Sequence, residues 1–366
     1  MSSKDFPTPS SKTGANLTQL PSISAAKNRT AVSVDWFQCT LKKSFKDLPL
    51  KTMSFELKIK DFRTSNFLTI AEVFYNDLRV FHLSYNPSSS FMSPNIVLLK
   101  VFNEVLYTHN WSKLLQVFLS EFQLIFNNLT RYDIAIDFTE FLTMASPERL
   151  IHRFLKSSVI KSNKGQFKVI GDNSAKMEFE YIRFGANSSD FSAYLYNKSK
   201  ELDQVKTKPY INAFWDEQGL NQEKEVWRLE FSVKVPKLDF MDFDGTILNS
   251  FHDYRDFTPH QLYYLLTFLM EKYFKFYKNE GKNRRDRNKH IKLLDFGIYE
   301  DFKVPRYCKS DGSRSDKVFL NKILRNDEEL RVKAPKLAKH FQNIAVKFAE
   351  QRGLSKYLEN RPTKKK

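Results

Sequence analysis

Alternation of apolar and polar residues is the main pattern between residues 31 and 237. Successive side chains of a β-strand point to opposite faces of a sheet, so a period of two predicts strands. Eight segments carry this period, at 31–41, 54–60, 67–75, 79–85, 131–138, 176–185, 191–198 and 225–235. This part of the chain is therefore expected to form a sheet-rich domain.

Apolar residues at helical spacing mark the remaining elements. The expected helices cover 112–129, 146–157, 258–278, 316–325 and 335–350. Ser146 and Pro147 suit the N-cap and first turn of the second helix. Thr258 and Gln261 have the spacing of a capping box at the start of the third, with Pro259 between them. The helices are thus concentrated after the last strand.

This order predicts an α+β protein, in which a mostly antiparallel sheet with flanking helices is followed by a basic helical C-terminal part. The expected divisions are a flexible arm at 1–30, the sheet domain at 31–237, a linker at 238–257, a basic helical domain at 258–360 and a disordered tail at 361–366.

The stretch "LDFMDFDGTILNS" at 238–250 resembles the start of a haloacid dehalogenase-type phosphatase. In that interpretation Asp242 is the nucleophile and Asp244 the acid/base. The residues that follow are mainly aromatic and basic, without the parallel strands and later catalytic groups of that class. Asp244 and Gly245 instead suit a turn at a domain boundary.

Positive charge is concentrated late in the chain. The net charge is +17, and residues 271–366 hold 27 Lys and Arg against 13 Asp and Glu. Such asymmetry favours a polyanionic partner, above all nucleic acid. Residues 278–292 alone contain seven Lys and Arg, and the candidate phosphate contacts there are Arg284, Arg285, Arg287 and Lys289. A solvated loop is the alternative.

Several classes are disfavoured by composition. Two cysteines, Cys39 and Cys308, cannot form a disulfide framework or a zinc site by themselves. No run of eighteen apolar residues occurs, and the first residues lack the apolar block of a signal peptide. The expected location is therefore the cytoplasm, with no membrane partner.

Carboxylates interrupt three apolar strands. In "RYDIAIDF", Asp133 and Asp137 share one face, while Asp35 and Glu230 lie between apolar neighbours in "SVDW" and "VWRLEFSV". Clustered acids are costly to bury unless a cation holds them, and Mg²⁺ or Mn²⁺ prefers oxygen ligands. The alternative is that these acids form salt bridges with Arg131 and Arg228, or face water.

Tyrosines and basic residues follow in the hairpin at 180–202. Tyr194 and Tyr196 share a strand face, and Lys198 and Glu201 come shortly after them. A phenol becomes a nucleophile when a base or cation favours the phenolate. Attack on a phosphodiester would then conserve the bond energy in a phosphotyrosine. Packing is the alternative for any one strand tyrosine.

The order of four segments resembles the Rep_trans group of rolling-circle replication initiators and the related relaxases of integrative elements. These segments are "SVDWFQCTL", "RYDIAIDF", "YIRFGANSSDFSAYLYNKSKEL" and "VWRLEFSVK". The resemblance covers about residues 31–236 and implies a nuclease or relaxase-type domain. It implies Tyr196, or Tyr194, as nucleophile, with Lys198 beside it and Glu201 as a base or further metal ligand. It also implies a Mg²⁺ or Mn²⁺ site of Asp35, Asp133 or Asp137, and Glu230. The hairpin departs from the family's usual Gly-Ser turn, and the C-terminal part has no match.

The implied activity is nicking of one DNA strand at an origin, with a 5′-phosphotyrosine intermediate, a 3′-hydroxyl primer and later rejoining. The expected partners are origin duplex and single-stranded DNA, a host helicase and replication proteins, and a second copy of the chain. A relaxase with the same chemistry, a non-catalytic DNA-binding regulator and a phosphatase are the alternatives. The seven histidines form no His-hydrophobic-His metal pair, so a metal site here would use carboxylates.

Overall fold

The computed structural model describes most of the chain from residue 30 to 294 and shorter C-terminal pieces. The described residues are 30–45, 47–89, 92–143, 146–162, 165–172, 178–186, 188–204, 208–235, 237–241, 247–279, 289–294, 306–308, 335–351 and 354–355. The chain divides into two compact units, the first formed by Met1–Pro236 and His252–Val304 and the second by Lys237–Phe251 and Pro305–Lys366.

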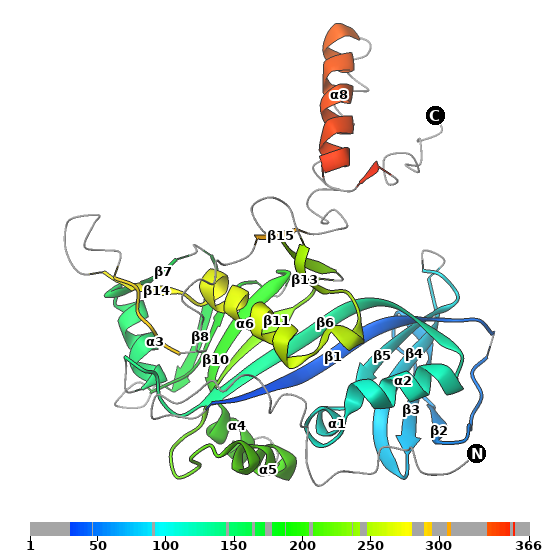
Figure 1. Cartoon of the computed structure of the whole chain (residues 1–366), viewed down its shortest axis with the longest axis horizontal. Helices are drawn as coiled ribbons and strands as arrows, with labels where there is room; N and C mark the ends of the chain where they lie inside the picture. Colours follow the sequence, from blue (N-terminus) through cyan, green and yellow to red (C-terminus); the bar gives the residue numbers. More distant parts are fainter. Residues whose placement is uncertain are drawn as a thin grey trace. The chain divides into compact units, whose positions relative to one another are not determined.

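A ten-stranded antiparallel sheet forms the first unit (Figure 1). In spatial order its strands are β2 (Phe55–Lys60), β3 (Phe67–Tyr75), β4 (Leu78–Pro87), β5 (Ile96–Val101), β1 (Ala31–Lys43), β6 (Leu124–Phe138), β11 (Trp227–Val233), β10 (Phe191–Asn197), β9 (Glu178–Phe184) and β8 (Phe167–Asp172). The two longest strands, β1 and β6, pair at the centre. The α+β class with an antiparallel sheet is thus confirmed.

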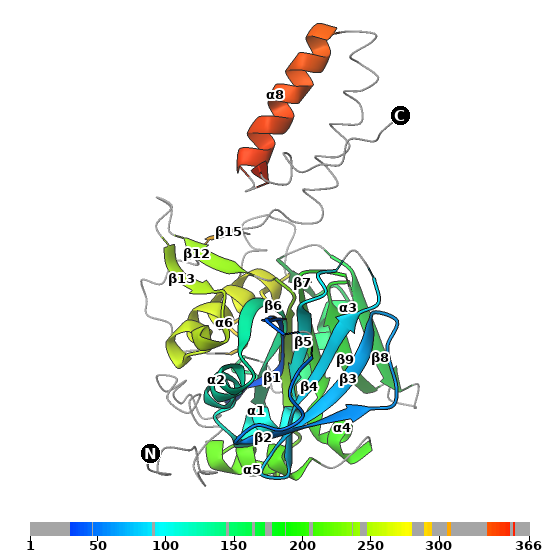
Figure 2. The same ribbon diagram turned by 90° about the vertical axis from the view of Figure 1, so that its right-hand side faces the viewer.

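The two faces of the sheet differ in chemistry. On the apolar face, the ring of Phe37 on β1 packs at a tilt against Trp111, and that of Phe191 on β10 stacks on Tyr273. Helices cover this face, namely α2 (Trp111–Glu121), α3 (Pro147–Leu155) and α6 (Pro259–Tyr273). Figure 2 shows α2 and α6 on the same side of the sheet. This face holds the main core, because it buries the apolar half of each alternating strand.

The opposite, polar face meets helices at one end. These are α1 (Asn103–Thr108), α4 (Lys198–Gln204) and α5 (Pro209–Gln218), which lie together below the sheet in Figure 1. A short pair of strands, β7 (Val159–Lys161) and β14 (Phe276–Lys278), and a 3₁₀ turn, η2 (Tyr254–Asp256), complete the first unit. No helix in the described ranges is long and apolar enough to span a bilayer.

The second unit holds a small antiparallel sheet and a helix. Its strands are β13 (Ile247–Phe251), β12 (Leu238–Met241) and β15 (Arg306–Cys308), and its helix is α8 (Pro335–Gln351). The expected linker at 238–257 therefore contains two strands, and Phe240 and Phe251 are buried. The helix expected at 258–278 is α6, which ends at Tyr273 and belongs to the first unit. The divisions of the chain thus differ from the expected ones.

All eight predicted strand segments overlap strands of the sheet, but the helices expected at 112–129 and 258–278 both end early. The helix expected at 112–129 ends at Glu121, because Gln123 takes a left-handed φ of 50° and β6 starts at Leu124. From Leu124 to Leu129 the chain pairs with β1 instead of continuing the helix. Long-range pairing thus overrides the local helical spacing. The arm, the tail, the helix expected at 316–325 and the Asp242 motif lie outside the described residues.

We expect Phe118→Ala to reduce the free energy of unfolding by about 3–5 kcal/mol, measured by denaturant titration. Phe118 is fully buried on the apolar face, where its ring lies 5.4 Å from Phe55 and 5.0 Å from Phe81. Leu68→Ala, at a position 52% exposed, is the control and should change stability by less than about 1 kcal/mol. Equal losses in both variants would contradict this account of the core.

Candidate active site

The polar face brings the predicted carboxylates and tyrosines together. Three rows of paired residues cross the central strands β1, β6, β11, β10 and β9. They are Asp137, Arg228, Tyr196 and Tyr181; Ala135, Glu230, Tyr194 and Arg183; and Trp36, Asp133, Ser232 and Ser192. The shared faces predicted for Asp133 with Asp137 and for Tyr194 with Tyr196 are confirmed by this register.

A β-bulge in β1 brings both Asp35 and Trp36 to the same face. Val34 pairs with Ile134 and Trp36 with Asp133, so Asp35 is one extra residue in the strand. A bulge redirects a side chain that regular alternation would send to the other face. Asp35 and Trp36 are consequently both available to the polar face.

Arg228 lies buried between two acids. Its Nε and Nη2 donate to the two carboxylate oxygens of Asp137 at 2.6 and 2.7 Å, and its Nη1 donates to Asp35 at 2.7 Å. Trp215 of α5 donates its indole N–H to Asp137 at 2.7 Å. Arg228 and Asp137 are both fully buried. Three donors therefore occupy Asp137, which matches the predicted alternative of a salt bridge with Arg228.

Asp35 accepts further hydrogen bonds from α1. Tyr107 donates its hydroxyl at 2.6 Å and Asn103 donates its amide at 3.2 Å to the same Asp35 oxygen. Burial opposes ionisation, but Arg228, together with Lys198 and these donors, outweighs it and holds the pKa of Asp35 well below its ordinary value. Asp35 is therefore a carboxylate throughout the neutral range.

Glu230 has the opposite electrostatic environment. Burial raises the pKa of Glu230 to about 8, and the negative charges of Asp35 and Asp133 add to the rise. The hydroxyl of Tyr196 donates to its Oε2 at 2.9 Å. A carboxyl group that titrates near neutral pH, within hydrogen-bond reach of a phenol, is suited to accept the proton of that phenol.

Three tyrosines surround this carboxyl group. Burial, followed by the charge of Glu230, raises the pKa of Tyr196 well above its ordinary value. Tyr194 is the cross-strand partner of Glu230, and its hydroxyl accepts a hydrogen bond from Ser192 at 3.3 Å. Tyr181 lies opposite Tyr196, and burial raises its pKa to about 12. Tyr196 is the tyrosine with a hydrogen bond to Glu230.

Lys198 and Glu201 lie at the start of α4, beside Tyr196. Lys198 is buried and forms an ion pair with Glu201, and its ammonium lies 5.5 Å from the centre of the Tyr196 ring. Burial, with Arg228, lowers the pKa of Lys198. The cation can therefore release a proton more readily than an exposed lysine.

The fit to a divalent cation is partial. Asp133 is held by Arg131 in a bidentate ion pair, as in the predicted alternative, and burial raises its pKa. Among the residues that the structure describes, no group of three or more His, Cys, Asp or Glu is arranged to hold a metal. The charges of Asp35 and Asp133 nevertheless raise the pKa of Glu230. A cation near these three carboxyl groups would reduce the repulsion between them.

The predicted DNA contacts of the basic segment are mostly not described. Arg284, Arg285 and Arg287 lie outside the described residues. Lys289 is exposed, and its carbonyl accepts a hydrogen bond from the backbone of Lys278 at 3.1 Å. A role of this segment in DNA contact stays a prediction.

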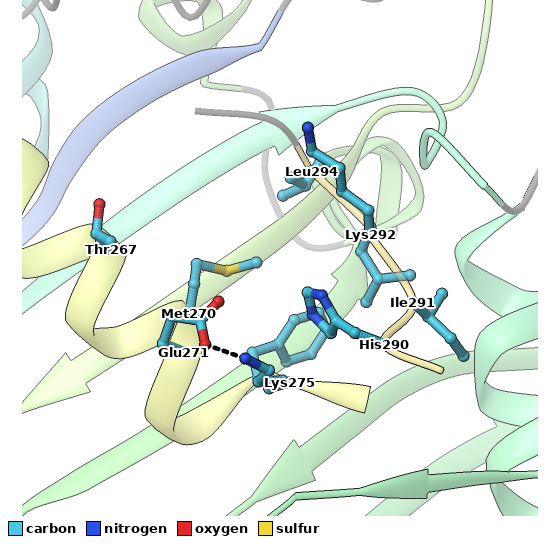
Figure 3. Close-up of a pocket in the computed structure, with 10 residues that line it drawn as sticks. Thr267, Met270, Glu271, Lys275, His290, Ile291, Lys292 and Leu294 are labelled. Carbon is cyan, nitrogen blue, oxygen red and sulfur yellow. Dashed lines mark hydrogen bonds and ion pairs between the residues drawn. The ribbon is translucent and has the colours of Figure 1, made fainter. Parts of the chain in front are cut away.

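A cavity of about 250 Å³ lies between the end of α6 and residues 290–294 (Figure 3). It is lined by Thr267, Met270, Glu271, Phe274, Lys275, His290, Ile291, Lys292, Leu293 and Leu294. Phe274 packs on the apolar face, at 6.5 Å from Phe231 and 6.1 Å from Phe184. The cavity thus opens on the side of the sheet away from the tyrosines, and no predicted catalytic residue lines it.

The sequence did not predict the helices whose side chains hydrogen-bond to the carboxylates of the polar face. Helices α1 and α5 were not predicted, although they supply Asn103, Tyr107 and Trp215. Pro209 in the first turn and Gly219 after the last turn of α5 were usable signals. Tyr181 was predicted to lie in a strand, but its position opposite Tyr196 was not foreseen.

No protein-family model matches the chain, and no curated protein sequence matches it. Among solved structures, the chain is similar to the "Structure of Rolling Circle Replication Initiator Protein from Geobacillus stearothermophilus". The TM-score is 0.43 with 15% sequence identity, over 73% of this chain and 93% of that chain. This likeness is one of fold and transfers no residue role.

We expect Arg228→Met to reduce the free energy of unfolding by about 3–5 kcal/mol, because it leaves the buried Asp137 carboxylate without its cation. Denaturant titration measures the loss. The double variant Arg228→Met, Asp137→Leu removes both charges and should recover part of it. A double variant less stable than the single one would contradict this account.

Glu230 should make stability depend on pH. The pKa of Glu230 is raised on folding, from 4.5 to about 8. The protonated group therefore contributes fully to the free energy of unfolding below pH 4.5, and this contribution is lost as the pH rises through about 8. Without divalent cations, Glu230→Gln should be more stable than the wild type by about 1–3 kcal/mol at pH 8.5 and similar to it at pH 5. Denaturant titrations at the two pH values test this. A constant difference between the proteins would show that ionisation of Glu230 is not the cause.

Proposed function

We propose that this protein is a DNA nicking and closing enzyme that acts through Tyr196. The observation that carries the proposal is the hydrogen bond from Tyr196 to Glu230, a carboxyl group with a pKa of about 8 in a cluster of acids. A structural tyrosine needs no partner that titrates near neutral pH. The charge of +17 favours a polyanionic substrate.

In the proposed step, the Tyr196 oxygen attacks the phosphorus of one phosphodiester. The new bond joins that oxygen to phosphorus, and the bond from phosphorus to the 3′-oxygen breaks. Glu230, in its ionised form, takes the phenol proton, and Lys198 supplies a proton to the departing 3′-oxygen. The products are a 5′-phosphotyrosine and a free 3′-hydroxyl, and the reverse reaction rejoins the strand.

A divalent cation, Mg²⁺ or Mn²⁺, would be held by Asp35, Asp133 and Glu230. When bound, it would neutralise charge on the phosphate that is attacked. Glu230 takes the phenol proton on Oε2, the oxygen that accepts the Tyr196 hydrogen bond. Asp137 contributes by holding Arg228, and Glu201 by holding Lys198.

Initiation of rolling-circle replication is the role that we favour for this chemistry. It requires an enzyme that keeps the phosphodiester energy and leaves a 3′-hydroxyl for synthesis. A relaxase of a mobile element would use the same step. Origin duplex, single-stranded DNA and replication proteins such as a helicase are the partners that this role needs.

A non-catalytic DNA-binding regulator is the second candidate. The ion pairs of Asp133 with Arg131 and of Asp137 with Arg228 favour it, because they give two of the acids a structural role. Such a protein would bind DNA without cleaving it in any metal.

We expect the wild type, with Mg²⁺ or Mn²⁺, to nick a supercoiled plasmid that carries the DNA flanking its coding sequence. A covalent protein–DNA adduct should be seen on a denaturing gel, and EDTA should abolish it. Tyr196→Phe should remove the adduct, because it lacks the attacking oxygen, with a loss of at least about 1,000-fold in rate.

Tyr194→Phe and Tyr181→Phe are the matched controls on the same face and should retain the adduct. If one of these variants loses the adduct while Tyr196→Phe retains it, the tyrosine replaced in that variant is the nucleophile. An adduct that survives in all three variants would rule out this tyrosine cluster. DNA binding without cleavage would favour the regulator.

A further inference from the structure

A cluster of cations lies on the polar face, beside the acids and tyrosines. Trp36 on β1 is half-buried, and the ammonium of Lys100 lies 3.4 Å from the centre of its ring. The guanidinium of Arg131 lies 4.5 Å from the same ring. Lys100 is on β5 and Arg131 on β6, the two strands that pair with β1. The indole thus holds one cation from each neighbouring strand.

This arrangement is fixed by the sheet and its hydrogen bonds. Gln38 pairs with Lys100 on one side and with Arg131 on the other, and its side chain accepts the indole N–H of Trp36 at 3.3 Å. Arg131 is held further by its ion pair with Asp133. Cations placed over an aromatic ring in this way are attracted to its face, and they lose less freedom when an anion binds.

The cluster has more positive than negative charge. The charged groups that act on Lys100 or on its neighbour His82 are Lys60, Glu72, Arg79, Arg131, Asp133 and Lys208. Both acids in this set are already engaged, Glu72 by Lys60 at 2.8 Å and Arg79 at 3.0 Å, and Asp133 by Arg131.

Within the described ranges, Lys100 forms no ion pair, and Asp133, the acid that acts on it, is already paired with Arg131. Burial lowers the pKa of Lys100, and the charge of Arg131 lowers it further. An anion at this place would relieve the repulsion between the cations.

We propose that Trp36, Lys100 and Arg131 bind phosphate groups of the single DNA strand that leads to Tyr196. This inference rests on the proposed nicking function. Trp36 is three strand positions from β10, about 14 Å at the usual strand spacing. Its partner Asp133 lies four residues along β6 from Asp137, which is in the row of Tyr196, and this adds about 13 Å in the perpendicular direction. Trp36 is thus roughly 19 Å from Tyr196, a distance that a single strand covers in a few nucleotides.

An unpaired strand suits the site better than a duplex. Tyr196 is half-buried and its hydroxyl donates to Glu230, and α1, α4 and α5 stand at that end of the polar face. A phosphate inside a duplex would have to leave its helix to reach that oxygen, whereas a single strand can follow the face of the sheet. The cations over Trp36 would then hold the strand in register with the attacking oxygen.

Binding should be measured apart from cleavage, in a Tyr196→Phe background with EDTA. The probes are a labelled 12-nucleotide oligo(dT) strand and a duplex of equal length, read by fluorescence anisotropy at several salt concentrations. Lys100→Gln should weaken binding of the single strand at least three-fold. It should also reduce the slope of log K against log salt by about 0.7, the value for one phosphate contact on a single strand.

Lys113→Gln is the matched control, because it removes the same charge from an exposed position on α2, over the other face. It should bind like the background protein. Trp36→Leu is a second variant and should weaken binding in the same direction, with circular dichroism to check its fold. Equal behaviour of Lys100→Gln and Lys113→Gln would overturn the inference, and so would an equal loss on duplex and single strand.

The two proposals fail in different ways. If the wild type forms a covalent adduct but Lys100→Gln binds DNA normally, the nicking function stands and the phosphate site falls. If no adduct forms but Lys100→Gln still loses single-strand affinity and salt dependence, the phosphate site stands and the nicking function falls.

Discussion

The buried guanidinium of Arg228 holds the polar face of the sheet in its present arrangement. Asp137 and Asp35 come from two different strands, and Arg228 on a third strand donates to both. A buried carboxylate without a cation would be strongly unfavourable, so the positions of these strands and of the α5 helix, through Trp215, depend on one another. The ion pair thus makes a polar layer possible at the centre of a large sheet.

This anchoring explains why neighbouring carboxyl groups behave differently. Asp35 lies next to Arg228 and the donors of α1, which lower its pKa, whereas Glu230 lies one row away and receives the negative charge of Asp35 and Asp133. The same strand thus carries a permanent cation at Arg228 and, two residues later, a group that titrates near neutral pH. Asp35 and Glu230 thus have pKa values shifted in opposite directions, and Glu230 accepts a hydrogen bond from a phenol. Pairs of carboxyl groups with such different pKa values are typical of sites where a proton is transferred.

The sheet also distributes charge across its polar face. Acids on β1, β6 and β11 lie near the tyrosines of β10, whereas cations collect over Trp36 at the junction of β5, β1 and β6. The apolar face, covered by α2, α3 and α6, keeps these rows in register because it buries the alternate side chains of the same strands. One face of the sheet thus holds the apolar core, and the other holds the charged and phenolic side chains.

The sequence by itself determined the two-faced strands and the residue types on each face, since a period of two fixes the direction of the side chains wherever a strand is regular. Asp133 and Asp137, and Tyr194 and Tyr196, could be paired for that reason. It also indicated the salt bridges to Arg131 and Arg228 as an alternative to a metal.

Only the tertiary structure decided which partner each carboxylate has. The bulge at Asp35, the order of the strands and the donors from α1 and α5 depend on contacts between residues up to 193 positions apart, such as Asp35 and Arg228. Local spacing carries no information on such contacts. The same limit explains the helix expected beyond Glu121, where pairing with β1 prevailed over helical periodicity.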